Sequence, residues 1–232
     1  MLKPSASGKS VNFLEAKSCG QKQRVWMEEE ATLWIEEVAS LCKPEQVHLC
    51  SGSREEYAQL QEAAIVLNCD YRPDSLLTGS YPPSARADRT FICTRSQNNN
   101  EPTDRWNDTD RMLARLHGLF DGSMIGRIMY VVPFATGPLD SPKSRLGFEI
   151  TDSPDVVANM HIMTLVGEDV LMLLEKKGEF VRGLHTLGCP IVGEQAMDTL
   201  SCYFPEAHEL WSYRCAPSTR ELLHEFVVPT HR

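Results

Sequence analysis

His48 and Cys50 are the residues whose types and spacing come nearest to a metal site in this sequence. They stand two positions apart in VHLC (47–50), which is predicted to be a short strand, so both side chains lie on one face of it. Imidazole nitrogen and thiolate sulfur are preferred ligands of Zn²⁺, but zinc motifs normally supply a second close pair. The sequence offers no such pair beside them. The spacing therefore favours a plain strand, and we expect no metal ligands here.

The run GRIMYVVPFATGPLDSP (126–142) raises a second chemical question. Pro133, Gly137 and Pro138 interrupt an apolar stretch; proline fixes φ, and glycine reaches backbone conformations that other residues avoid. Two interpretations are open. The segment is either a turn that only defines the fold, which is favoured, or a nest of backbone amides around an anion.

Composition limits the partners. The chain has 232 residues, 42% of them hydrophobic, which is enough for one large domain or two small ones. With 23 basic and 32 acidic residues the net charge is −9. A protein that grips nucleic acid needs the opposite sign, so we expect no nucleic-acid partner, although a local basic site can still bind a small anion. No apolar run is long enough for a membrane helix, so no membrane partner is expected.

The cysteines indicate the compartment. The sequence contains eight of them, with no CxxC and no pairing pattern in their spacing. The N-terminus has no apolar segment typical of a signal peptide. Together these features predict reduced thiols in a cytoplasmic protein.

Apolar periodicity and turn residues predict the elements that position these groups. Helices are predicted at 24–42, 53–68, 108–120, 153–167 and 168–178, and strands at 47–50, 90–94, 128–134, 145–151, 179–188, 199–204 and 208–213. SQNNNEPTDRWND (96–108) predicts a polar loop.

Three helix starts carry their own signals. Ser53 with Glu56 forms a capping box, Asp108 caps its helix, and Ser153 is followed by Pro154 at the first helical position. We expect these helices to begin where the caps place them.

Two neighbouring strands predict how the sheet is built. The strand at 128–134 is apolar on both faces and is expected inside the sheet, whereas the strand at 145–151 alternates and is expected to be half-buried. The connection between them is too short for a crossover helix, so they should pair antiparallel. The fold class is therefore α/β (mixed α+β), a mixed sheet with helices packed on it, and not a doubly wound parallel sheet.

Several motifs, in one order, resemble the GTP-dependent phosphoenolpyruvate carboxykinases. GRIMYVVPFATGPLDSPKSRLGFEITDSPDVVANMHIMT resembles a family stretch with GRTMYV-PFSMGP-GSP, LTDSPYVV and MRIMTRMG. PEQVHLCSG, SARADRTFIC, LHTLGCPI and FPEAHELWSY resemble CPEGIHICDG, DVARVEDRTFIC, LHSVGCPL and FPETREIWSF. The resemblance covers roughly residues 45–213. It implies the fold of that family's N-terminal, substrate-side domain.

The resemblance also implies a reaction. The family converts oxaloacetate and GTP to phosphoenolpyruvate, CO2 and GDP in gluconeogenesis, as a decarboxylating lyase that uses Mn²⁺ or Mg²⁺. Arg86 falls on the family's substrate-binding arginine, and a guanidinium binds a carboxylate through two hydrogen bonds. Asp88 falls on an acidic residue that helps couple substrate binding to lid closure. Without the resemblance, Arg86 would be interpreted as a solvated loop arginine.

The sequence also departs from the family. After Trp211-Ser212-Tyr213 the family continues into GSGYGGN and a lysine pair, whereas this chain has Arg214 and no similar segment. The family's metal-binding lysine, histidine and aspartate, its phosphate loop and its lid lie beyond that point, and no GxxxxGK[ST] occurs in the sequence. The resemblance therefore implies no catalytic residue, no metal ligand and no bound cofactor in this chain. MRIMTRMG is changed too, with His161 and Leu165 in place of its arginines.

These observations define the expected organisation. We expect a flexible tail at 1–22, a phosphoenolpyruvate carboxykinase N-terminal-like domain at 23–213 and a divergent tail at 214–232, where STRELLHEF predicts a short helix. Self-association is expected through an exposed interdomain surface, for which Trp211, Phe226 and Val227 are candidates.

The expected function is that of the family's N-terminal domain, with the chain inactive by itself. One alternative is a non-catalytic module that binds a small carboxylate (oxaloacetate or phosphoenolpyruvate) or a protein partner. The other is a truncated remnant without a ligand.

Overall fold

The computed structural model describes residues 29–71, 89–96, 105–137, 139, 144–177, 180–188 and 199–215. Within these ranges the helices are α1 (Glu29–Cys42), α2 (Arg54–Tyr71), α3 (Thr109–Phe120), α4 (Pro154–Met163) and α5 (Glu168–Lys177). The strands are β1 (Gln46–Leu49), β2 (Thr90–Thr94), β3 (Trp106–Asp108), β4 (Ile128–Thr136), β5 (Arg145–Thr151), β6 (Leu165–Val166), β7 (Val181–Thr186), β8 (Leu200–Phe204) and β9 (Glu209–Tyr213).

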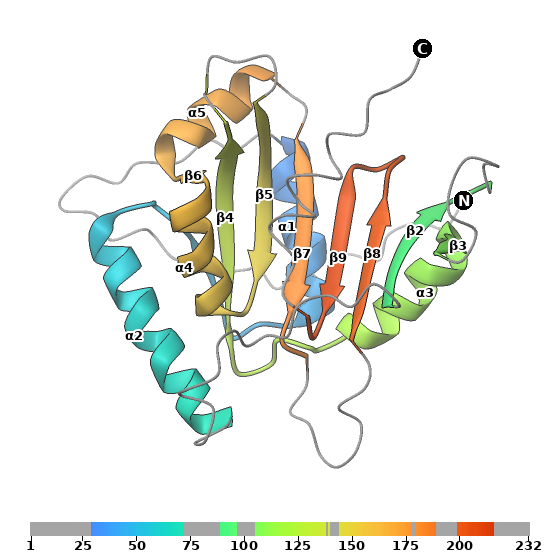
Figure 1. Cartoon of the computed structure of the whole chain (residues 1–232), viewed down its shortest axis with the longest axis horizontal. Helices are drawn as coiled ribbons and strands as arrows, with labels where there is room; N and C mark the ends of the chain where they lie inside the picture. Colours follow the sequence, from blue (N-terminus) through green and yellow to red (C-terminus); the bar gives the residue numbers. More distant parts are fainter. Residues whose placement is uncertain are drawn as a thin grey trace, which may run out of the picture.

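All the described strands belong to one mixed sheet (Figure 1). Their order is β1-β4-β5-β7-β9-β8-β2-β3, and β6 pairs with β4 beside this path. β4 and β5 are antiparallel neighbours, as their short connection predicted, and β8 and β9 form a second antiparallel pair. β5, β7 and β9 run parallel to one another, so the predicted mixed sheet is confirmed.

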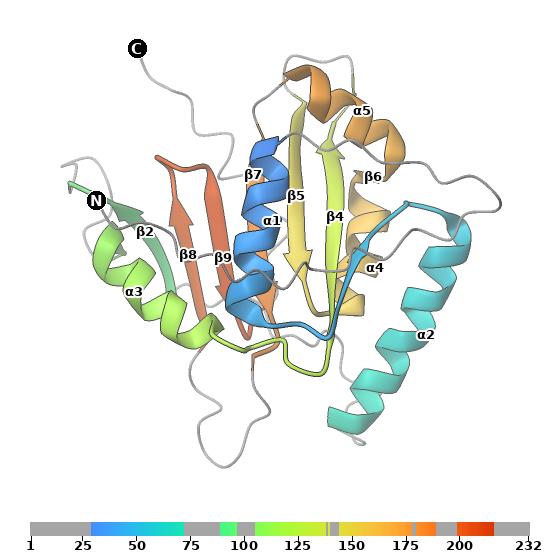
Figure 2. The same cartoon turned by 180° about the vertical axis from the view of Figure 1, so that it is seen from behind.

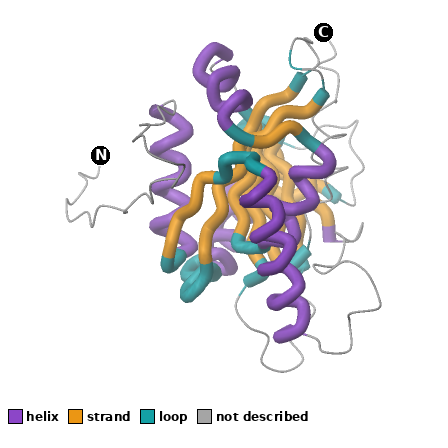
Figure 3. The backbone as a smooth tube through the Cα atoms, turned by 90° about the vertical axis from the view of Figure 1, so that its left-hand side faces the viewer, coloured by secondary structure: helices purple, strands orange, loops and turns teal. Residues whose placement is uncertain are grey.

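Helices cover both faces of the sheet (Figures 2 and 3). β4 explains the layering, because its side chains alternate between two apolar clusters. Met129 and Val131 join a cluster with residues of α1, α3 and α5, whereas Val132 and Phe134 join a cluster with residues of α2 and α4. A strand that is buried on both faces belongs inside a sheet, as the sequence predicted.

The predicted helix starts at Asp108 and Ser153 are confirmed. The carboxylate of Asp108 accepts the backbone N–H of Arg111 at 2.9 Å, and α3 begins directly after it. The hydroxyl of Ser153 accepts the N–H of Val156 at 3.4 Å, and Pro154 occupies the first turn of α4. Both caps satisfy N–H groups that have no partner within the helix.

The capping box of α2 is present in a modified form. Ser53 Oγ accepts the N–H of Glu56 at 3.2 Å. The Glu56 carboxylate reaches back past the cap and accepts the N–H groups of Ser51 at 3.1 Å and Gly52 at 2.8 Å. The side chain of Glu56 is therefore held in a fixed place beside the end of β1.

Three sequence expectations are wrong. β5 is not half-buried, since everything from 146 to 151 is buried, because helices pack on both faces of the sheet. Trp211 is not left bare; it is only 5% exposed and packs against the rings of His117 and Phe120. The loop predicted at 96–108 contains the short strand β3, and the helix predicted at 153–167 ends before the short strand β6. These strands form because β2 and β4 offer them hydrogen-bonding partners.

Pro133 lies within β4, and its position has a physical reason. β4 pairs with β1 up to Val131 and with β6 from Phe134, so Pro133 falls where the strand changes partner on that side. A residue without an N–H group is tolerated where no ladder bond is needed. Gly137 has φ +75°, as its predicted role in the following turn requires, whereas Pro138 lies outside the described residues.

Candidate functional site

Several charged and polar groups lie at the carboxyl ends of the parallel strands, which we call the carboxyl edge of the sheet. β5, β7 and β9 are parallel, so their carboxyl ends meet there. Asp152 follows β5, Gly188 lies two residues after β7, and Arg214 follows β9. Because β4 is antiparallel to β5, Arg127, which precedes β4, lies at the same edge. In open α/β sheets this is the edge at which ligands bind.

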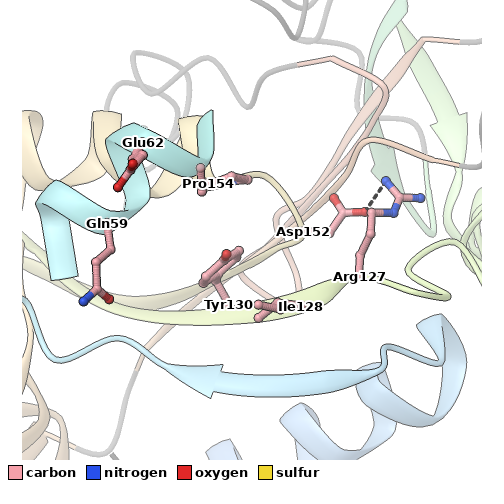
Figure 4. A pocket seen from close by; sticks show the side chains of 8 residues that line it. Gln59, Glu62, Arg127, Ile128, Tyr130, Asp152 and Pro154 are labelled. Carbon is pink, nitrogen blue, oxygen red and sulfur yellow. Dashed lines mark ion pairs between the residues drawn. The ribbon is translucent and has the colours of Figure 1, made fainter. Parts of the chain in front are cut away.

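A buried ion pair joins the elements at this edge (Figure 4). Arg127 Nη1 lies 2.8 Å from Asp152 Oδ2, and the Asp152 side chain is fully buried. Thr186 Oγ1 donates to Oδ2 at 2.9 Å, and the Leu187 N–H donates to Oδ1 at 2.8 Å. Arg127 Nη2 also donates to the backbone carbonyls of Ser123 and Gly188. The pair therefore ties β4, β5 and β7 together.

Burial dominates the ionisation of this cluster. It raises the pKa of Asp152, although Arg127, the Leu187 N–H and the Thr186 hydroxyl act in the opposite direction. Burial, assisted by the charge of Arg127, lowers the pKa of His185 to about 3, so this imidazole is neutral at physiological pH. His185 Nδ1 lies 2.7 Å from Thr151 Oγ1.

A cavity of about 510 Å³ lies beside the ion pair, between α2 and the sheet. Figure 4 shows Gln59 and Glu62 on the α2 side, Tyr130 near the middle and the ion pair at the other end. The remaining lining residues are Ala63, Ile128 and Pro154. Arg127 is the cation among these lining residues, and its charge is already balanced by Asp152.

Arg214 holds the end of β9 in a conformation that suits glycine. Its φ is +55°, in the left-handed region, and its backbone N–H donates to the Thr186 carbonyl at 2.9 Å. Its guanidinium lies over the ring of Tyr213, 5.2 Å from the ring centre. Gly188 lies against these two side chains, because a Cβ placed on it would be 2.8 Å from Arg214 Nε. The backbone here keeps the left-handed turn although the residue is an arginine.

The predicted site residues Arg86 and Asp88 lie outside the described residues. The described chain resumes at Arg89 and enters the sheet at Thr90. Thr90 pairs with Ser201, which pairs with Ser212 near the carboxyl end of β9. β2 therefore starts at the same edge as Asp152 and Arg214, a few residues after Arg86.

Sequence reasoning missed the Arg127–Asp152 pair. Both residues lie in segments quoted for the resemblance, GRIMYV and TDSP, and they flank the two strands that were predicted to pair antiparallel. Their contact depends on the antiparallel pairing of β4 with β5, which places the start of one strand beside the end of the other. The predicted antiparallel pairing was therefore the available signal, but the register that brings these two residues into contact was not predicted.

An open mixed sheet with charged groups at the carboxyl ends of its parallel strands defines an α/β domain of the kind in which ligands bind at those strand ends. The chain belongs to the phosphoenolpyruvate carboxykinase N-terminal domain family, which matches residues 33–219. It is 42% identical over 214 residues to the phosphoenolpyruvate carboxykinase [GTP] of Corynebacterium jeikeium, covering 86% of this chain and 34% of that protein. The enzyme of the same name from Chlamydia abortus is 47% identical over 149 residues, covering 61% of this chain and 25% of that protein. The chain thus spans between a quarter and about a third of the length of these relatives.

None of the described helices is long and apolar enough to cross a membrane.

Proposed function

We propose that this chain provides the substrate side of a GTP-dependent phosphoenolpyruvate carboxykinase. It binds the carboxylate of oxaloacetate or phosphoenolpyruvate at the edge where β5, β7 and β9 end. Arg86 supplies the cation, and Asp88 couples binding to closure of the site. The observation that carries this proposal is the entry of β2 at that edge directly after these two residues.

The electrostatics of the edge support a separate cation for the substrate. Arg127 already bonds Asp152 and two backbone carbonyls, so a substrate would have to break a buried ion pair to use it. A guanidinium that enters the edge from the segment before β2 has no such cost. Arginine suits this role because its planar fork matches a carboxylate.

The division of labour follows from the family reaction. We assign the binding of GTP and of the Mn²⁺ or Mg²⁺ ion to the parts of the family proteins that lie outside the matched N-terminal domain. We also assign the protein to the cytoplasm. The 232-residue polypeptide by itself is then expected to bind the carboxylate without decarboxylating oxaloacetate. GTP-dependent decarboxylation by the pure polypeptide would contradict this assignment.

Thermal unfolding with and without millimolar phosphoenolpyruvate tests the binding step. A ligand at about a hundred times its dissociation constant stabilises the folded state by about 2.7 kcal/mol, which raises the midpoint clearly. We expect Arg86→Ala to abolish the shift. Arg145→Ala is the matched control, because Arg145 is exposed at the start of β5, the opposite end from the site, and should keep the shift.

The outcomes separate the alternatives. If phosphoenolpyruvate still raises the unfolding midpoint of Arg86→Ala, the cation that binds the carboxylate is a residue other than Arg86. A cooperative transition with no shift in the parent protein would remove carboxylate binding and leave a domain that binds a protein partner or no ligand.

A further inference from the structure

Three potential metal ligands meet at the carboxyl end of β1, at the opposite end of that strand from the candidate site. His48 lies in β1, and Cys50 is the residue directly after that strand. Glu56 lies in the first turn of α2. His48 Nε2 lies 2.7 Å from Glu56 Oε1. One ligand atom from each of the three residues lies within 4.8 Å of the other two. The fold therefore places the Glu56 carboxylate beside His48 and Cys50, the pair identified in the sequence.

A fourth donor, His161, comes from α4. Its Nε2 lies 3.8 Å from Glu56 Oε2, and its side chain is only 9% exposed. This ring nitrogen is buried and has no hydrogen-bond partner among the described residues. A buried polar atom left without a partner costs about 1–3 kcal/mol, so each such atom calls for an explanation. The ring of Tyr57 packs 5.4 Å from the His161 ring and fixes its position.

The ligand atoms of His48, Cys50 and Glu56 lie close enough to share one cation, and His161 borders this group through Glu56. Thiolate, imidazole and carboxylate ligands together suit Zn²⁺ or Co²⁺ and not Mg²⁺. Ligands bound tetrahedrally at about 2.0–2.3 Å lie about 3.3–3.8 Å apart, so the three grouped donors would have to move slightly closer together and the His161 side chain would have to move towards them. The N–H groups of Ser51 and Gly52 already hold the Glu56 carboxylate, as hydrogen bonds usually do for metal-bound carboxylates.

One of the donors is partly accessible to solvent. His48 is 33% exposed and gives a cation a route to the buried donors.

We propose that His48, Cys50, Glu56 and His161 form a closed structural site for one zinc-type divalent cation, which joins β1, α2 and α4. This inference does not depend on the proposed function. The site lies apart from the Arg127–Asp152 edge, because β1 and β4 are parallel and begin at that edge, whereas the four donors lie beyond the end of β1. A cation here would stabilise the packing of α2 on α4 and would take no part in carboxylate binding.

Cobalt substitution of the purified 232-residue protein tests the site. After treatment with a chelator, Co²⁺ should bind with one ion per chain and give a thiolate-to-cobalt charge-transfer band with the visible bands of tetrahedral cobalt. Zn²⁺ should displace it and raise the unfolding midpoint, whereas Mn²⁺ at the same concentration should do neither.

Two variants report on the ligands. Cys50→Ser should abolish the charge-transfer band and weaken Co²⁺ binding by at least about tenfold. His161→Arg should weaken it similarly while the fold is kept, because arginine can pair with Glu56 from the same position. Comparing the unfolding of the His161→Arg protein without metal separates loss of the site from loss of the fold.

Two matched controls should bind Co²⁺ like the parent protein. Cys42→Ser changes another buried free thiol, and His208→Gln changes an exposed histidine in the turn between β8 and β9. The inference is overturned if the parent gives no thiolate band, or if the band persists in folded Cys50→Ser. It is also overturned if His161→Arg binds cobalt as tightly as the parent.

Discussion

Asp152 is the single residue on which the described part of the candidate site most depends. Its carboxylate is fully buried and receives one guanidinium, one hydroxyl and one backbone N–H. Breaking a buried pair by removing one partner leaves the other charge uncompensated. Arg127 would be that remaining charge, with its side chain only 18% exposed.

We therefore expect Asp152→Ala to lower the free energy of unfolding by about 3–5 kcal/mol, as measured by urea denaturation. Asp121→Ala is the control, because Asp121 pairs with Lys43 in a bridge whose side chains are 59% and 55% exposed. Removing such an exposed pair should cost at most about 1 kcal/mol. Equal losses in the two variants would contradict the structural role given to Asp152.

A second single residue, Glu149, makes the free energy of unfolding depend on pH. Both carboxyl oxygens are buried without a hydrogen-bond partner among the described residues, and Gly183 leaves the room for them. Burial raises the pKa of this carboxyl well above its ordinary value. The folded state then holds a proton that the unfolded state loses, so stability falls as pH rises from about 4.5 towards the folded pKa, by up to about 1.4 kcal/mol per pH unit.

Glu149→Gln cannot lose a proton and should remove this fall. Urea denaturation at pH 5 and pH 8 should show a smaller loss of stability in the variant, which should be more stable than the parent protein at pH 8. Glu36→Gln, on the exposed face of α1, should leave the parent's pH dependence unchanged. An identical pH dependence in the parent and Glu149→Gln would show that Glu149 is not the group responsible.

At the scale of elements, the loop after β1 is fixed by a close backbone crossing. A Cβ on Gly52 would lie 2.2 Å from the Val166 carbonyl oxygen, and φ there is +76°. A Cβ on Gly167 would lie equally close, 2.2 Å, from the Ser51 carbonyl oxygen. Only glycine fits both positions, so the crossing locks β6 against the loop that carries the α2 cap.

Gly52→Ala should accordingly destabilise the protein by more than about 1 kcal/mol in urea denaturation. Gly118→Ala should do the opposite and stabilise it by about 0.5–1 kcal/mol, because Gly118 lies within α3 with nothing within 4 Å of a new Cβ. If the two alanine variants changed stability in the same direction, the crossing would not be as tight as described.

For the whole molecule, self-association remains a prediction, but its proposed residues have changed. Trp211 is buried, and Phe226 and Val227 lie outside the described residues. Three of the exposed large apolar side chains among the described residues are close along the chain, at the end of α4 and in β6: Ile162 is 70% exposed, Met163 51% and Leu165 49%. Exposed apolar side chains that gather in one place are typical of interaction surfaces, so this segment is the candidate.

Sedimentation velocity over a range of protein concentrations tests this surface. We expect the weight-average sedimentation coefficient of the 232-residue polypeptide to rise with concentration, and the rise to be lost in the double variant Ile162→Lys, Leu165→Lys. Leu33→Lys, at a site on α1 that is 54% exposed, should keep the rise. A parent protein that is monomeric at every concentration would remove self-association.

The sequence by itself determined the elements whose causes are local. The caps at Asp108 and Ser153 and the β-branched run at 90–94 were predicted because caps and side-chain periodicity act within a few residues. Motif order determined the family in the same way. β3 and β6 could not be found, because such short strands form only where another strand offers its edge.

Tertiary structure alone decided which side chains meet. The sequence showed His48 beside Cys50 without a second pair, and only packing brought Glu56 of α2 to them and His161 of α4 to within 3.8 Å of Glu56. Arg127 and Asp152 likewise meet only because β4 pairs antiparallel with β5. The reason is physical: periodicity and caps report on neighbours along the chain, whereas contacts between distant segments depend on the register and packing of the whole sheet.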